Sequence, residues 1–182
     1  VVYFDLDVVP FTRENIFTEF NFEKCILCRV NHEGIKYEAL TKVGKVVRSP
    51  RAKWWNAREL LINEGLSGEN DVYNTGIIGG SRKQIQKLNY FENFDESLDM
   101  MHEMVLEDNN YPDYMQGLFG YDNETLFSYK MVMNDVNLIS MDDNWHFIMG
   151  KKISHIKSTA KLVHVISKDF EYAREKYEKN SI

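Results

Sequence analysis

The sequence predicts an α/β fold in which helices flank a sheet, forming one domain over residues 1–182. Apolar stretches rich in β-branched and aromatic residues alternate along the chain with segments that have helical spacing. The chain has 182 residues, of which 43% are hydrophobic and 13% are aromatic, which is enough to bury a substantial core. Neither an internal repeat nor a Pro- or Ser-rich linker interrupts the pattern.

Composition excludes several classes of function. Twenty-eight acidic residues against 22 Lys and Arg give a net charge of −6, which disfavours nucleic acid as a partner. The sequence contains no apolar run of about 18 residues, and its start is not of the secretory type. Cys25 and Cys28 lie in a predicted strand, where they are expected to be reduced and structural. Reduced cysteines fit a cytoplasmic location.

The first ten residues hold the main candidate site. An apolar strand is expected to end at Asp5 and Asp7, whose side chains share one face because they are two positions apart, while Leu6 points into the protein. Two carboxylates this close are unfavourable unless a cation neutralises them, and oxygen ligands suit Mg²⁺ or Mn²⁺. A strand followed by an acidic turn is the alternative interpretation.

Later elements follow in order. Thr12 is expected to cap a short helix that runs to about Phe20, and a strand follows from Cys25 to Val30. The turn after it predicts a hairpin, and a further short strand is expected at 43–47. A helix is predicted after Ser49-Pro50, and a glycine-containing strand at 71–81 precedes a helix from Ser81 or Arg82 to about Leu88.

The second half of the chain reads in the same way. Helices are predicted at 95–107, after Pro112, at 122–133 and at 168–179. Strands are predicted at 136–141 and 162–166. His164 lies inside the last strand, where the residues alone favour a hydrogen-bonded core histidine. Asp113 beside Pro112 is typical of an acid at a helix start, where the helix dipole favours it.

Three motifs resemble one known family. The stretch Tyr3-Phe4-Asp5-Leu6-Asp7-Val8-Val9-Pro10 resembles the DxD segment of metal-dependent, nucleotide-sugar glycosyltransferases of the GT-A fold. Asn74-Thr75-Gly76 is similar to the Asn-Thr-Gly segment that several of those families carry next. Leu162-Val163-His164-Val165 is similar to the strand that delivers a histidine to the metal.

The resemblance implies a mixed, mainly parallel, Rossmann-like sheet without the N-terminal nucleotide-binding part that these enzymes place before the DxD strand. It implies that Asp5, Asp7 and His164 hold Mn²⁺ or Mg²⁺, with Asp5 also near the ribose. The donor is then a nucleotide-diphosphate sugar such as a UDP-sugar, and the acceptor is a saccharide or glycoprotein. Because His164 offers a nitrogen ligand, the residues favour Mn²⁺ over Mg²⁺.

Further residues take roles from the same resemblance. Asn74, Thr75 and Gly76 are expected beside the donor sugar or the acceptor. Asp113 is the expected catalytic residue beneath the donor, where it would stabilise an oxocarbenium-like transition state or act as nucleophile or base. Several lysines could contact the diphosphate or simply form a solvated face, and four aromatic residues could stack on a sugar or simply pack. The lysines are Lys151, Lys152, Lys157 and Lys161, and the aromatic residues are Trp54, Trp55, Trp145 and His146.

Two other functions remain open. The same first motif resembles that of haloacid-dehalogenase-type phosphatases, in which Asp5 would be the nucleophile and Asp7 a general acid. Ser81, Lys130 or Lys151, and Asp142-Asp143 would complete that site. A sugar-binding or structural protein without catalysis is the third possibility.

Overall fold

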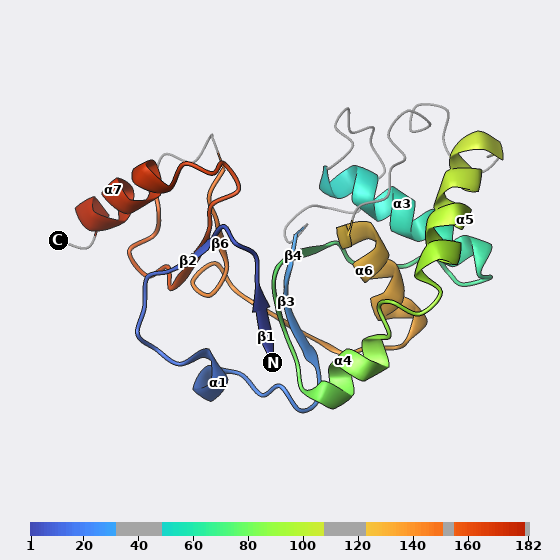
Figure 1. Ribbon diagram of the computed structural model, residues 1–182, viewed down its shortest axis with the longest axis horizontal. Helices are drawn as coiled ribbons and strands as arrows, with labels where there is room; N and C mark the ends of the chain where they lie inside the picture. The colour runs from blue at the N-terminus through green and yellow to red at the C-terminus, as the bar shows by residue number, and fades with distance from the viewer. Residues whose placement is uncertain (32–48, 108–122, 151–154, 181–182) are drawn as a thin grey trace. The chain divides into compact units, whose positions relative to one another are not determined.

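The computed structural model describes residues 1–31, 49–107, 123–150 and 155–180. The chain divides into two compact units (Figure 1). A sheet unit comprises residues 1–29, 75–82 and 138–182, and a helical unit comprises residues 30–74 and 83–137. Among the described residues, no helix combines the length and apolar character needed to cross a membrane.

Two small mixed sheets carry the strands. The first has the order β1-β4-β3-β5, and the second has the order β2-β7-β6. β1 pairs antiparallel with β4, and β3 pairs parallel with β5. β2 pairs antiparallel with β7, which pairs parallel with β6. In chain order the strands are β1 (Val2–Phe4), β2 (Val8–Pro10), β3 (Ile26–Val30), β4 (Tyr73–Gly79), β5 (Leu138–Ser140), β6 (Phe147–Ile148) and β7 (Leu162–His164).

The predicted α/β class is therefore confirmed at the level of mixed sheets with helices. Two strands were not predicted, because β2 has three residues and β6 has two, which is too short to show periodicity. β2 follows β1 after a turn of three residues and joins the other sheet. The first stretch is thus two strands with the two acids between them.

Two short helices complete the sheet unit. α1 (Ile16–Glu19) is capped by Asn15, whose side chain accepts from the Phe17 N–H, so the prediction of Thr12 as the cap was wrong. α7 (Phe170–Asn180) lies beside the β2-β7-β6 sheet (Figure 1). The ring of its Tyr177 stacks on Phe11 at a centroid distance of 4.1 Å, and its hydroxyl donates to the Phe11 carbonyl at 2.8 Å.

Two hydrophobic clusters form the core of the sheet unit. One surrounds β7 and β6 and includes Val163, Phe147 and, from α7, Ala173. The other includes Leu27, Ile77, Met141, Trp145 and Leu162. Cys25 and Cys28 are buried with free thiols, as predicted.

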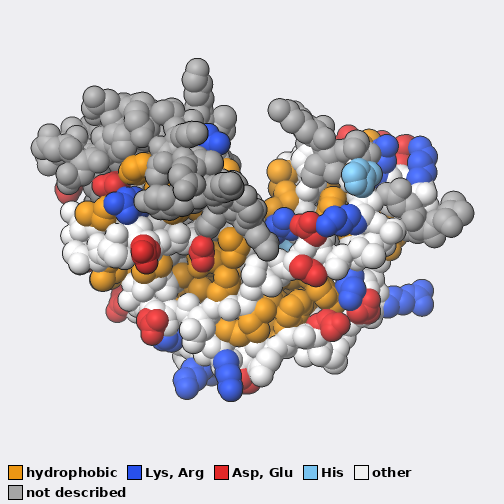
Figure 2. Space-filling view, turned by 180° about the vertical axis from the view of Figure 1, so that it is seen from behind, with side chains coloured by type: hydrophobic (Ala, Val, Ile, Leu, Met, Phe, Trp, Pro, Cys, Tyr) orange, Lys and Arg blue, Asp and Glu red, His pale blue; other side chains and the backbone are white. Residues whose placement is uncertain are grey.

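Figure 2 shows that one face of the molecule carries hydrophobic side chains among charged ones.

The described part of the helical unit contains four helices. They are α3 (Pro50–Asn63), α4 (Arg82–Leu88), α5 (Phe94–Glu107) and α6 (Asn123–Met133), with the first residue of α4 still in the sheet unit. Ser49 caps α3 through the Ala52 N–H, and Pro50 occupies the first turn, where its missing N–H costs nothing. A core from α3, α5 and α6 includes Leu60, Leu61, Met101 and Leu126.

Three predicted elements cannot be compared with the structure. The hairpin after Asn31, the strand at 43–47 and the helix after Pro112 lie outside the described residues.

Candidate functional site

Asp5, Asp7 and His164 come together in the sheet unit. Each offers one ligand atom, and these atoms all lie within 4.8 Å of one another. The β2–β7 pairing produces this arrangement, because it places His164 opposite Val8, the residue next to Asp7. A backbone hydrogen bond from the Val165 N–H to the Asp7 carbonyl, at 2.8 Å, extends the pairing. The sequence predicted that these three residues would meet.

The two acids were expected to face the same way because they lie two positions apart in an extended strand, and this reason was wrong. Asp5 and Asp7 lie in a turn closed by a 3.1 Å hydrogen bond from the Val8 N–H to the Asp5 carbonyl, not in an extended strand. Leu6 at the tip of this turn is fully exposed, at 103%, although it was expected to point inward. The turn reverses the chain, so the carboxylates face His164 while the side chain between them faces solvent.

Distances within the group are short. The Nε2 atom of His164 lies 3.4 Å from Asp7 Oδ1 and 4.0 Å from Asp5 Oδ2. Asp7 and His164 are each only 5% exposed, whereas the Asp5 side chain is 36% exposed. The site therefore has a buried side, formed by Asp7 and His164, and an accessible side, formed by Asp5.

Asp5 is held from both its backbone and its side chain. Its N–H donates to the Gly76 carbonyl at 2.9 Å, next to the pairing of Phe4 with Ile77. The Tyr3 hydroxyl donates to Asp5 Oδ1 at 2.6 Å, and this bond is the main reason that the pKa of Tyr3 is raised. The Asn74-Thr75-Gly76 segment thus touches the site through its glycine. Asn74 and Thr75 are buried in β4.

Lys168 is a further member of the group. Its Nζ donates to Asp7 Oδ2 at 2.5 Å, and its backbone has a φ of 61°, which is uncommon for a residue with a side chain. Burial opposes ionisation of Asp7, but the hydrogen bond from Lys168 and the charge of His164 outweigh it and lower the pKa of Asp7. Lys168 was predicted only as the start of the last helix and not as a site residue.

His146 lies behind His164. It is completely buried, and its Nε2 atom lies 3.3 Å from His164 Nδ1. Burial, followed by the charges of His164 and Arg29, lowers the pKa of His146 to about 3. Burial also lowers the pKa of His164, against the opposing effect of Asp7 and Asp5. Both shifts favour the neutral form of each ring.

The residues fit a divalent cation. Two carboxylates and a neutral imidazole form a donor set that suits Mn²⁺, and metal–ligand bonds of about 2.1 Å allow two ligands to lie up to roughly 4.2 Å apart. Both distances from His164 Nε2, 3.4 Å and 4.0 Å, satisfy this limit. The ammonium of Lys168 on Asp7 also shows that the group accepts positive charge.

The other predicted residues are placed elsewhere or not at all. Asp113, Lys151 and Lys152 lie outside the described residues. Lys157 pairs with Asp143 and Lys161 with Glu14, each at 2.6 Å.

The aromatic candidates for sugar stacking are largely internal. Trp54, Trp145 and His146 are buried, at 3%, 6% and 0% exposure, which supports the packing alternative for these three side chains. Trp55 is partly buried and meets Trp54 edge to face.

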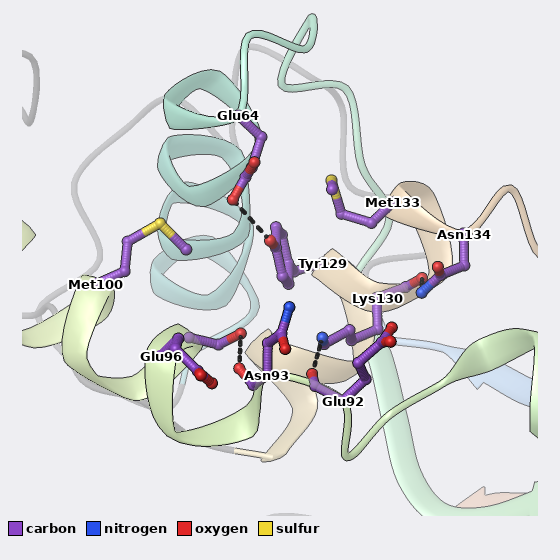
Figure 3. Close-up of a pocket in the computed structure, with 10 residues that line it drawn as sticks. Glu64, Glu92, Asn93, Glu96, Met100, Tyr129, Lys130, Met133 and Asn134 are labelled. Carbon is purple, nitrogen blue, oxygen red and sulfur yellow. Dashed lines mark hydrogen bonds between the residues drawn. The ribbon is translucent and has the colours of Figure 1, made fainter.

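A pocket of about 310 Å³ lies in the helical unit (Figure 3). Tyr129 donates to Glu64 Oε1 at 3.1 Å, and Lys130 donates to the Glu92 carbonyl at 2.5 Å. Burial, followed by the charge of Glu64, raises the pKa of Tyr129 to about 12. The lining contains Lys130 but none of the residues predicted for the metal or the donor.

No model of a known protein family matches the sequence, and no curated protein matches it. The functional argument therefore depends on the geometry of the Asp5, Asp7 and His164 group.

Proposed function

We propose that the chain is a metal-dependent glycosyltransferase that moves a sugar from a nucleotide-diphosphate donor, with a UDP-sugar as the first candidate, to a saccharide or glycoprotein acceptor. The observation that carries the proposal is the approach of His164 Nε2 to both carboxylates, at 3.4 Å and 4.0 Å. The GT-A, Rossmann-like arrangement with a mainly parallel sheet belongs to the same proposal.

In this proposal Asp5, Asp7 and His164 hold Mn²⁺ or Mg²⁺. When bound, the cation acts as a Lewis acid that offsets the negative charge developing on the departing nucleotide. Asp7 and His164 form the buried side of the site, which fixes them before any ligand arrives. Asp5 forms the accessible side, held through the carbonyl of Gly76. Asp113 is proposed as the catalytic residue beneath the donor sugar, where it would stabilise the transition state or act as nucleophile or base.

The phosphatase alternative has less support. It gives no role to His164, which contacts both acids. Its further metal ligands, Asp142 and Asp143, already have other partners. Asp142 accepts from the N–H groups of Asn144 and Trp145 at 3.0 Å, and Asp143 pairs with Arg29 and Lys157 at 2.6 Å.

Thermal unfolding with ligands tests the proposal. UDP at 100 times its Kd, with Mn²⁺, should stabilise the protein by about 2.7 kcal/mol, which raises Tm by roughly 5–10 °C. Asp7→Asn should abolish this shift, because it removes a ligand and its charge. Asp99→Asn, the same change at an exposed position of α5, should leave the shift unchanged.

Other outcomes select the alternatives. Hydrolysis of UDP-sugars only with Mn²⁺ would support the transferase. Stabilisation by beryllofluoride with Mg²⁺ in place of UDP would favour the phosphatase. A chain that responds to neither would have a binding or structural role.

A further inference from the structure

His146 and His164 form a buried imidazole pair. The ring centroids are 5.4 Å apart with an interplanar angle of 32°, and the exposures are 0% and 5%. A hydrogen bond between His146 Nε2 and His164 Nδ1, 3.3 Å apart, needs one N–H and one bare nitrogen. Each neutral ring has a single N–H, so the position of one proton fixes the tautomer of both rings.

Two arrangements satisfy this bond. In the first, His146 Nε2–H donates, and His164 carries its own proton on Nε2, facing the acids. In the second, His164 Nδ1–H donates, and its Nε2 presents a bare lone pair to the acids. The second arrangement moves the proton of His146 to Nδ1.

The far side of His146 decides between them. Its Nδ1 is buried and has no hydrogen-bond partner within the described part of the chain. A buried N–H without an acceptor costs more than a bare acceptor nitrogen. The 3.4 Å approach to Asp7 Oδ1 also favours an N–H on His164 Nε2. The cation-free protein therefore favours the first arrangement.

A metal ligand needs the opposite state. Histidine binds a cation through a bare ring nitrogen, and the proton on its other nitrogen is fixed by the group that it contacts. Binding at His164 Nε2 thus requires the second arrangement, which leaves His146 Nδ1–H buried without an acceptor. We propose that His146 is a positioning residue that sets the tautomer of His164 and thereby lowers the affinity of the Asp5, Asp7 and His164 group for divalent cations. The affinity part depends on the metal site proposed above.

The first test uses the metal-free protein and needs no activity. Long-range ¹H–¹⁵N NMR spectra distinguish Nδ1–H from Nε2–H histidines. We expect Nε2–H on both His146 and His164, and we expect Zn²⁺, used as a diamagnetic probe, to move both protons to Nδ1. Nδ1–H on His164 before any cation is added would overturn the proposal.

The second test compares two variants at the same position. His146→Met places a thioether beside His164 Nδ1, where the sulfur can accept weakly from the N–H of His164 and carries no N–H of its own to bury. We expect it to bind Mn²⁺ about tenfold more tightly than the natural protein in an EPR titration. His146→Phe removes the partner altogether, so it should bind Mn²⁺ no more tightly than the natural protein.

The outcomes separate this proposal from the one it depends on. Equal Mn²⁺ affinity in the natural protein and in His146→Met would show that His146 only packs. Absence of Mn²⁺ and Zn²⁺ binding to every form would remove the metal function and the affinity part together. The NMR spectra of the metal-free protein would still show whether His146 sets the tautomer of His164.

Discussion

Two acidic turns of the sheet unit begin alike and differ in what their carboxylates contact. Asp5-Leu6-Asp7 follows β1, and Asp142-Asp143-Asn144 follows β5. In the second turn, Asp142 binds backbone N–H groups and Asp143 binds Arg29 and Lys157. In the first turn, both carboxylates face an imidazole.

The difference lies in what each turn packs against. The second turn has a guanidinium and an ammonium within 2.6 Å of Asp143, and these lower the pKa of Asp143 against the effect of burial. The first turn has one ammonium, on Lys168, whose side chain is 68% exposed. In these two turns, the pair of acids that forms a candidate site is the one whose neighbouring strand supplies an imidazole, while the other turn meets cationic side chains. The predictions below test this contrast, starting from the largest effect.

Stability should fall on acidification because of His146, which lies between the second turn and β6. Its pKa is about 3 in the folded protein and 6.5 without the fold, so the unfolded chain takes up the proton first. Stability is thus complete above pH 6.5 and is lost as the pH falls toward 3. The contribution of His146 should amount to about 2 kcal/mol between pH 7 and pH 5.

Urea unfolding at these two pH values measures this loss. His146→Gln should reduce the pH dependence by that amount, since glutamine does not titrate. If the stability of His146→Gln depended on pH as steeply as that of the natural protein, other titrating groups would cause the effect.

Asp142→Ala should destabilise the protein without changing its affinity for Mn²⁺. The variant loses two hydrogen bonds from backbone N–H groups, which are worth about 1–2 kcal/mol together. Urea unfolding measures the first effect and an EPR titration the second. If Asp142→Ala bound Mn²⁺ more weakly under conditions in which the protein is fully folded, the two turns would not be independent.

Lys168→Met should strengthen Mn²⁺ binding a few-fold. Its ammonium, 2.5 Å from Asp7 Oδ2, competes with a cation for the same carboxylate. Lys161→Met is the matched control, because Lys161 belongs to the same unit but pairs with Glu14. An equal gain in both variants would indicate only the loss of one positive charge.

Leu6→Ser should change stability least, by less than about 0.5 kcal/mol, because the side chain is fully exposed. Leu27→Ala, at a position only 1% exposed, should cost about 2–5 kcal/mol in the same urea experiment. A large loss in Leu6→Ser would restore the original expectation that Leu6 points inward.

Sequence reasoning found Asp5 and Asp7 from residue type and spacing, whereas it named His164 as a ligand only through the family resemblance, because the residues alone favoured a core histidine. It failed at the turn between β1 and β2, since seven apolar residues interrupted only by Asp5 and Asp7 do not reveal a chain reversal inside the stretch. Strand direction was equally hidden, because strands of two to five residues carry no sign of their partners.

Lys168 was missed as a site residue, and His146 was named only as a residue that stacks on a sugar or packs, for a related reason. Each reaches the site through tertiary structure: Lys168 lies after β7 with a left-handed backbone, and His146 lies in the loop before β6. No local pattern specifies either contact.

The pairing of β2 with β7 has a consequence for the order in which the molecule forms. Asp7 and Lys168 are separated by 161 positions, so their contact must wait until the ribosome has released nearly all of the chain described here. Contacts between such distant segments form slowly. A nascent polypeptide that stops before residue 162 would carry both acids of the first turn and lack the imidazole that they face.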